Sequence, residues 1–274
     1  MKKFLLLVCF SSFISSELIL EITQGTEDPF RVAIIKFNGD NKATSEIDQI
    51  IKNNLMRSGE FKIFDNDDLL SLPKDEDEIV FNDFRILNID YLIIGNLINE
   101  SSNIKAEYKV YDIRKGSKVR SSTVFGIPNK NRQLAHYISD GIYEEITGIK
   151  GIASTKILYV TQNKDYRLVV ADADGKNEQI LLESSEPIIS PSWSPDSKKV
   201  AYVSFETGIA KVFIQDIASG NREVVIENSS QISSPAWSPD GKFLSLTMYQ
   251  DGNAEIYILN LKNKNLTRLT NHYA

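Results

Sequence analysis

The first half of the chain alternates between strand-like and helix-like patterns of hydrophobic residues. Residues 31–37 form a β-branched run that ends at Asn38-Gly39-Asp40, which predicts a strand followed by a turn. The next residues predict a helix that Ser45 caps and that ends at Ser58-Gly59, with a further strand at 61–64. Its apolar side chains recur at helical spacing: Ile47, Ile50, Ile51 and Leu55.

A nearly continuous apolar run at 91–98 is typical of a central strand covered on both faces, and 105–113 alternates like a neighbouring strand. Further helices are predicted at 67–72, 81–87 and 132–146. The apolar stripe of the last one consists of Leu134, Ile138, Ile142 and Ile146. Because Gly148 and Gly151 then mark a linker, we interpret residues 17–150 as one α/β domain and 151–274 as a second domain.

From residue 154 onward, short β-rich segments are separated by turns and repeat with a fixed period. The segment Ser190-Pro-Ser-Trp-Ser-Pro-Asp196 reappears as Ser234-Pro-Ala-Trp-Ser-Pro-Asp240, which places the two tryptophans 44 residues apart. Asp172, Asp216 and Asn260 follow strand-like segments at the same interval of 44 residues. Repeats of about 40–45 residues with four strand-like segments are typical of β-propeller blades, which bury their apolar faces by stacking on one another.

The repeated residues have structural explanations within such blades. Trp193 and Trp237 are expected in the core between blades rather than against a sugar or a base, because stacking must bury large apolar areas. Asp196 and Asp240 are expected to form turns rather than a catalytic pair, since Ser-Pro-Asp-Gly at 238–241 suits a type I turn. In the second blade, strands are predicted at 200–204, 211–215 and 222–226.

The N-terminus has the pattern of a secretory signal at 1–16. Lys2 and Lys3 precede an apolar core at 4–10 and a stretch rich in serine. The only cysteine, Cys9, lies inside that core, so a mature chain has no disulfide, cysteine-based metal site or cysteine nucleophile. The net charge is −6, and removal of the two lysines makes it −8, which argues against a nucleic-acid partner.

The Ser-Pro-x-Trp-Ser-Pro-Asp repeat resembles the propeller repeat of the TolB family. Glu17-Leu-Ile-Leu-Glu-Ile-Thr-Gln-Gly25 resembles the N-terminal segment of that family, and Ile146-Thr-Gly-Ile-Lys-Gly151 resembles its junction before the propeller. The resemblance implies an α/β N-terminal domain followed by all-β propeller blades. It also implies a periplasmic, non-enzymatic component of the Tol-Pal system, without metal or cofactor, that supports outer-membrane integrity and cell division and is linked to protein import.

The same resemblance implies two protein partners. These are the lipoprotein Pal, at one face of the propeller, and the inner-membrane protein TolA, at the N-terminal segment. The loops at 186–189, 230–233 and 270–273 are expected on the Pal face. The candidate partner-binding residues are Glu17, Leu18, Ile19, Leu20, Glu21 and Ile22 in the N-terminal segment, and Ser230, Gln231, Ser233 and His272 in the loops.

The number of repeats departs from the family pattern. From residue 157, 118 residues remain, which is about 2.7 periods of 44 residues. About three of the six blades that the family implies are therefore expected. We interpret the chain as C-terminally truncated; a second hypothesis is that two copies complete one ring.

The sequence offers little support for three other functions. The acidic run at 74–78 lacks the spacing of a calcium-binding loop and is interpreted as a solvated loop. A propeller belonging to a prolyl-oligopeptidase-like peptidase would need a Gly-x-Ser-x-Gly motif, which the sequence lacks. A ligand-binding propeller is a further alternative, although no metal-ligand motif or phosphate-binding glycine loop supports it.

Overall fold

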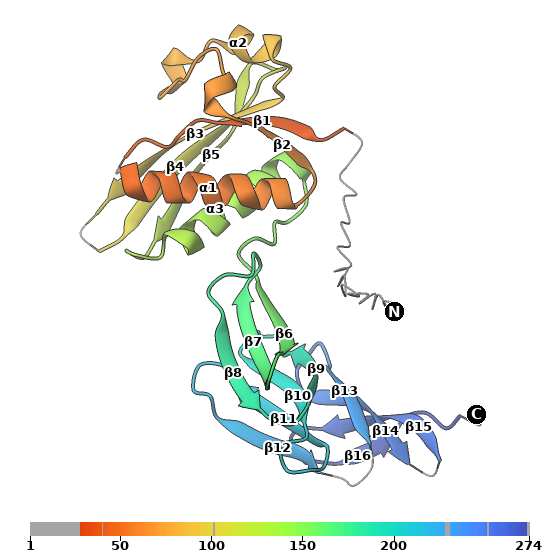
Figure 1. The fold of residues 1–274 in the computed structure, drawn as a ribbon. Helices are drawn as coiled ribbons and strands as arrows, with labels where there is room; N and C mark the ends of the chain where they lie inside the picture. Colours follow the sequence, from red (N-terminus) through yellow and green to blue (C-terminus); the bar gives the residue numbers. More distant parts are fainter. Residues whose placement is uncertain (1–27, 40, 101, 228–230, 251, 273–274) are drawn as a thin grey trace, which may run out of the picture.

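The computed structural model describes residues 28–272 apart from Asp40, Ser101, 228–230 and Asp251. Residues 28–150, which we call the α/β region, contain one five-stranded sheet with the order β2-β1-β3-β4-β5 (Figure 1). Strands β1, β2 and β3 are parallel, and β3, β4 and β5 form an antiparallel meander. The bounds are Phe30–Ile34 (β1), Phe61–Phe64 (β2), Tyr91–Asn99 (β3), Ile104–Asp112 (β4) and Ser117–Gly126 (β5).

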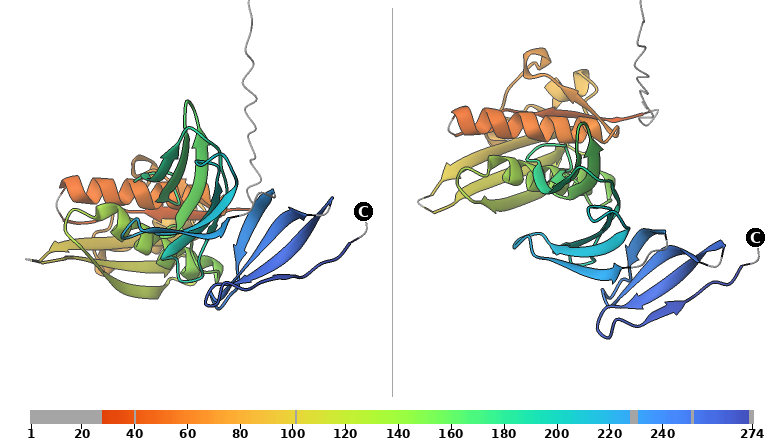
Figure 2. Two further views of the ribbon diagram at one scale, coloured as in Figure 1. Left: turned by 90° about the horizontal axis from the view of Figure 1, so that it is seen from below. Right: turned by 60° about the horizontal axis from the view of Figure 1, so that its bottom comes forward.

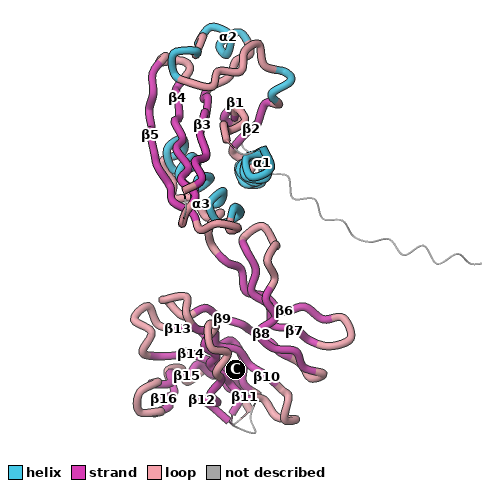
Figure 3. Tube along the Cα trace, turned by 90° about the vertical axis from the view of Figure 1, so that its left-hand side faces the viewer, coloured by secondary structure: helices cyan, strands magenta, loops and turns pink. Residues whose placement is uncertain are grey.

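Helices cover both faces of this sheet. Helices α1 (Asn41–Arg57) and α3 (Asn131–Thr147) pack on one face, where they enclose Val32 and Ile34 of β1. The opposite face, with Ala33, is covered by α2 (Phe81–Ile86) and two short 3-10 helices, Asn66–Asp68 and Glu76–Glu78. Figure 3 views α1 end-on beside the sheet. Successive residues of β1 thus point into separate cores, one on each face of the sheet, as expected for a sheet that is covered on both faces.

Some predicted elements differ from those observed. The first helix begins at Asn41, about one turn before the predicted cap, so Ser45 lies inside the helix, next to the fully buried Thr44. Residues 67–72 are not an α-helix; only the short 3-10 helix reaches into them. Strand β5 was not predicted, since its sequence is largely polar. It forms because its backbone pairs along the full length of β4.

The second half of the described chain forms three antiparallel sheets, which we call the first, second and third blades (Figures 1 and 2). The first blade contains β6 (Lys156–Gln162), β7 (Tyr166–Asp172) and β8 (Gln179–Ser184). The second contains β9 (Ile188–Trp193), β10 (Lys199–Ser204), β11 (Lys211–Asp216) and β12 (Arg222–Glu227). The third contains β13 (Ile232–Trp237), β14 (Phe243–Gln250), β15 (Asn253–Asn260) and β16 (Leu266–Arg268). The predicted fold class is therefore confirmed.

Both tryptophans lie between neighbouring blades. Trp193 packs against the apolar cluster that joins Leu168 of the first blade to the second blade. Trp237 packs against the cluster shared by the second and third blades, and its Nε1 donates a hydrogen bond to the carbonyl of Ser192 at 3.3 Å. Their predicted role as inter-blade core residues is confirmed.

The repeated aspartates form the predicted turns. Ser194 Oγ donates to Asp196 Oδ1 at 2.6 Å, and Ser238 Oγ donates to Asp240 Oδ1 at the same distance. In the third blade, the Gly241 amide donates to the carbonyl of Ser238 at 2.9 Å and closes the turn. The serine hydrogen bonds hold the pKa of both aspartates below the ordinary value. These carboxylates therefore stabilise turns.

No helix in the described part of the chain is long and apolar enough to cross a membrane.

Candidate functional site

Three of the predicted partner-binding residues lie at the same end of the third blade. Gln231 precedes β13, and its carbonyl accepts a hydrogen bond from the Tyr249 amide near the end of β14 at 2.9 Å. Ser233 lies in β13. His272 lies beside the start of β15, where the Asn253 side chain donates to its carbonyl. Gln231 and His272 are exposed and Ser233 is half-buried, so this end of the blade is accessible.

The other predicted residues fall in different places. Glu17–Ile22 and Ser230 lie outside the described residues. The segment 186–189 occupies the corresponding end of the second blade, because the carbonyl of Pro187 accepts a hydrogen bond from Phe205, which follows β10, at 3.0 Å. The structure thus places 186–189 and Gln231 at equivalent ends of adjacent blades.

A buried carboxylate holds the chain that follows β16. Glu255 of β15 accepts hydrogen bonds from the Thr270 hydroxyl, from the His272 amide at 2.6 Å and from Arg268 Nη2 at 2.9 Å. Glu255 itself is almost completely buried. The Thr270 and His272 hydrogen bonds lower the pKa of Glu255 to about 2, because they stabilise its charged form. Glu255 therefore positions the candidate residue His272.

We expect acid to release this segment. The pKa of Glu255 in the folded chain lies below its ordinary value of 4.5, so the stabilisation is complete above pH 4.5 and is lost as the pH falls toward 2. Glu255→Ala should release the segment already at pH 7, seen as loss of amide protection at His272 by hydrogen exchange. As a control, Glu144→Ala changes an exposed glutamate of α3, away from the third blade, and should leave that protection unchanged. Unchanged protection in Glu255→Ala would contradict this role.

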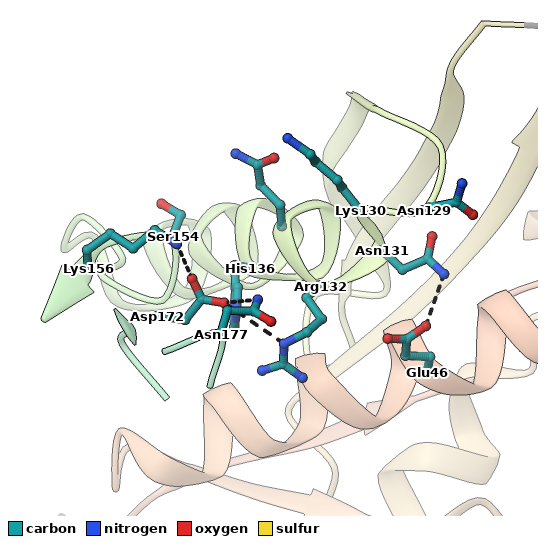
Figure 4. A pocket seen from close by; sticks show the side chains of 11 residues that line it. Glu46, Asn129, Lys130, Asn131, Arg132, His136, Ser154, Lys156, Asp172 and Asn177 are labelled. Atoms are coloured by element: carbon teal, nitrogen blue, oxygen red, sulfur yellow. Dashed lines mark hydrogen bonds and ion pairs between the residues drawn. The ribbon is translucent and has the colours of Figure 1, made fainter. Parts of the chain in front are cut away.

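A second site lies between the α/β region and the first blade. It is a polar pocket of about 420 Å³ whose wall includes residues of α3, of β6 and of the β7–β8 turn. Figure 4 shows His136 and Arg132 projecting from α3 toward Asp172. Arg132 Nη2 binds Asp174, Lys156 Nζ binds Asp172, and Asn177 Nδ2 donates to Asp172 at 2.6 Å. The Arg132–Asp174 contact joins the two halves of the described chain, whereas Lys156 and Asn177 hold Asp172 within the first blade.

The linker between the two halves is held from the same helix. Asp140 of α3 accepts hydrogen bonds from the Ala153 amide at 2.6 Å and the Ser154 amide at 2.9 Å. Gly151 lies so close that a Cβ there would approach the Cα of Asp140 to 2.5 Å. The predicted linker glycine is thus required by close packing of the linker on α3.

His136, Asp172 and Asp174 form the one group of three described His, Asp, Glu or Cys side chains whose ligand atoms lie within 4.8 Å of one another. Such a set suits a divalent cation only if its oxygens are free to coordinate. Here each carboxylate is already bound by a cationic side chain, Arg132 on Asp174 and Lys156 on Asp172. The arrangement is therefore that of a charge network that joins two structural units.

Sequence reasoning placed His136 on a helix but missed this pocket. The blade repeat contained one signal. Asp172 shares its repeat position with Asp216 and Asn260, and two residues later the first blade has Asp174 where the others have Ala218 and Lys262. Asp216 binds its own turn through the Ser219 amide at 2.8 Å. The additional carboxylate of the first blade instead reaches across to α3.

Comparison with known proteins identifies the relatives of the chain. A model of the TolB amino-terminal domain matches residues 18–119, and a model of the TolB beta propeller domain matches residues 143–274. The Tol-Pal system protein TolB of Alcanivorax borkumensis is 43% identical over 74% of this chain and 48% of the relative. The same protein of Hahella chejuensis is 40% identical over 78% of this chain and 52% of the relative. The chain thus spans about half the length of these relatives.

A solved structure agrees with both halves of the described fold. The crystal structure of TolB from Acinetobacter baumannii is 34% identical and superposes with a TM-score of 0.85, covering 92% of this chain and 63% of that one. The match extends over the α/β region and the blades together, and the two family models match in the same order along the sequence. The chain therefore belongs to the TolB family.

Proposed function

We propose that this chain is a non-enzymatic, periplasmic interaction component of the Tol-Pal system. The observation that carries the proposal is the combination, in one chain, of a TolB amino-terminal region and TolB propeller blades. The curated relatives with this combination are named Tol-Pal system proteins. The peptidase and ligand-binding alternatives are not favoured, because they account for the propeller alone. In this role the chain supports outer-membrane integrity, constriction during cell division and protein import.

Two surfaces are proposed for two partners. Gln231, Ser233 and His272 present polar groups at one accessible end of the third blade, and Ser230 adjoins them in the sequence. This end is proposed to bind the lipoprotein Pal. The short N-terminal segment Glu17–Ile22 combines two acidic residues with four apolar ones, and such a segment in an extended conformation can add to the sheet edge of a partner, here TolA. We propose residues 1–16 as a cleaved export signal, with 17–150 and 151–274 as the two domains.

Binding measurements on the whole chain test both partners. Pal should bind the chain in calorimetry, and a double variant, Gln231→Ala with His272→Ala, should weaken this binding by about tenfold, since truncating contact residues typically costs about 1–2 kcal/mol. Deletion of Glu17–Ile22 should abolish binding to TolA and leave binding to Pal in place. The matched control, Lys164→Ala, lies in the β6–β7 hairpin of the first blade and should leave both unchanged.

The outcomes separate the parts of the proposal. Folded chain that binds neither Pal nor TolA would refute the assignment to the Tol-Pal system. Pal binding that the double variant leaves intact would refute the proposed face only. TolA binding that survives the deletion would refute the role of the N-terminal segment.

A further inference from the structure

His136 is a buried titratable side chain at the contact between α3 and the first blade. It is only 2% exposed, although it lies on the helix that faces the polar pocket. Asn54 of α1 contacts one side of its ring, and Asp172 at the end of β7 and Asp174 in the β7–β8 turn face the other. The proposed partner-binding function does not use this residue.

The hydrogen bonds around Asn54 determine which ring nitrogen carries the proton. Asn54 Nδ2 lies 2.9 Å from His136 Nδ1 and donates to Ser139 Oγ at 2.9 Å. Its Oδ1 accepts a hydrogen bond from Arg57 Nη2 at 3.3 Å. The contacts with Ser139 and Arg57 orient the Asn54 amide with its NH₂ group toward His136. Nδ1 of His136 therefore acts as the acceptor, and the neutral ring carries its proton on Nε2. Protonation of Nδ1 would place two donors face to face.

The other side of the ring offers limited compensation for a positive charge. His136 Nε2 lies 3.8 Å from Asp172 Oδ2 and 3.9 Å from Asp174 Oδ2, and it has no hydrogen-bond partner among the described protein atoms. The two carboxylates are already balanced by Lys156 and Arg132, and Arg57 adds a further cation beside Asn54. A charged imidazolium would therefore be a buried charge that the two carboxylates compensate only in part.

We propose that His136 is a pH-sensitive contact that holds the α/β region against the first blade when neutral and loosens this contact when protonated. The arrangement is particular to the first blade, since the position of Asp174 is occupied by Ala218 and Lys262 in the other two repeats. The inference goes beyond the proposed partner binding, because it concerns the relative arrangement of the two halves of the chain.

The direction of the pH effect follows from linkage. Burial lowers the pKa of His136 below its ordinary value of 6.5; Asp174 and Asp172 oppose this shift, and Arg132 and Arg57 add to it. In a loosened arrangement the ring would be exposed and would titrate near 6.5. The contact is therefore fully stabilised above pH 6.5 and weakens as the pH falls through the lower pKa of the closed arrangement. Within this window, the equilibrium constant for closing the contact between α3 and the first blade falls by up to about tenfold per pH unit.

Two measurements on the whole chain test the proposal. In the first, NMR of the ring nitrogens gives the pKa and tautomer of His136 in the unmodified chain; a pKa below 6.5 with the proton on Nε2 is expected. In the second, small-angle X-ray scattering gives the radius of gyration between pH 7.5 and 5. It should rise in the unmodified chain and stay constant in His136→Gln, whose neutral amide can accept from Asn54 and donate toward Asp172.

The controls isolate His136 from other groups. His272→Gln removes the only other histidine and should keep the pH response. Because burial raises the pKa of Asp48 to about 6, the scattering series is repeated in an Asp48→Asn background. A His136 pKa above 6.5, a radius that does not change with pH, or a response that persists in His136→Gln would each overturn the proposal. If His136→Gln does not fold, the NMR titration of the unmodified chain decides alone.

Discussion

Replacing Gly141 with alanine is expected to destabilise the α/β region by about 3 kcal/mol, the upper end of typical overpacking costs. Gly141 lies in α3, and a Cβ at this position would approach the hydroxyl oxygen of Tyr108 to 2.1 Å. Tyr108 lies on β4, between β3 and β5, and is 1% exposed, so its ring cannot turn away into solvent. The better helix propensity of alanine offsets only about 1 kcal/mol of the gross cost. Urea unfolding followed by circular dichroism measures the loss.

A double-mutant cycle identifies the clash as the cause. The Tyr108 hydroxyl is buried and has no hydrogen-bond partner in the described protein, so Tyr108→Phe alone should change stability by less than about 1 kcal/mol. In the Gly141→Ala background the same change removes the clashing atom, which leaves the ring carbon Cζ at 3.4 Å from the new Cβ. About 2 kcal/mol should be recovered. If the double variant is no more stable than Gly141→Ala, the clash is not responsible.

Trp237→Ala is expected to destabilise the packing of the third blade on the second by about 3 kcal/mol, the lower end of the range for removing large core aromatics. The indole packs on the cluster that includes Leu244 and Ala201, and its Nε1 donates to the carbonyl of Ser192 across the blade interface. Since a stack of repeats is stabilised by contacts between neighbours, the loss should be local. Hydrogen exchange should show faster exchange in β13–β15, with protection of β3 and β4 unchanged.

Two variants sharpen this prediction. Trp193→Ala should loosen the contact between the first and second blades instead, because Trp193 packs on the cluster that contains Leu168. Trp237→Phe keeps most of the apolar area and should lose much less stability. Equal exchange throughout the chain in Trp237→Ala would show that the blades do not behave as separately stabilised neighbours.

The blades were predictable because a repeat reports the same structural requirement twice. The Ser-Pro-Asp turns and the tryptophans each recur after 44 residues, and each has a local cause in turn geometry or apolar area. The α/β region was less completely predicted. Strand β5 alternates between exposed and half-buried residues and has no apolar run, so only its pairing with β4 makes it a strand.

The candidate site was predictable only in part. The resemblance of the repeats led to Gln231, Ser233 and His272, and the fold brings them to one end of the third blade. The residue that holds His272 there, Glu255, was missed because a glutamate in an alternating strand usually faces solvent. Its burial results from the return of the chain after β16.

By itself, the sequence determined the fold class, the 44-residue repeat, the turns and the tryptophan stacking, because these depend on local periodicity and on side-chain shape. Only the tertiary structure decided that His136 and Arg132 of α3 meet Asp172 and Asp174 of the first blade. The reason is physical: a linker held by Asp140 sets the position of the first blade on α3, and no local pattern encodes which charges then become neighbours.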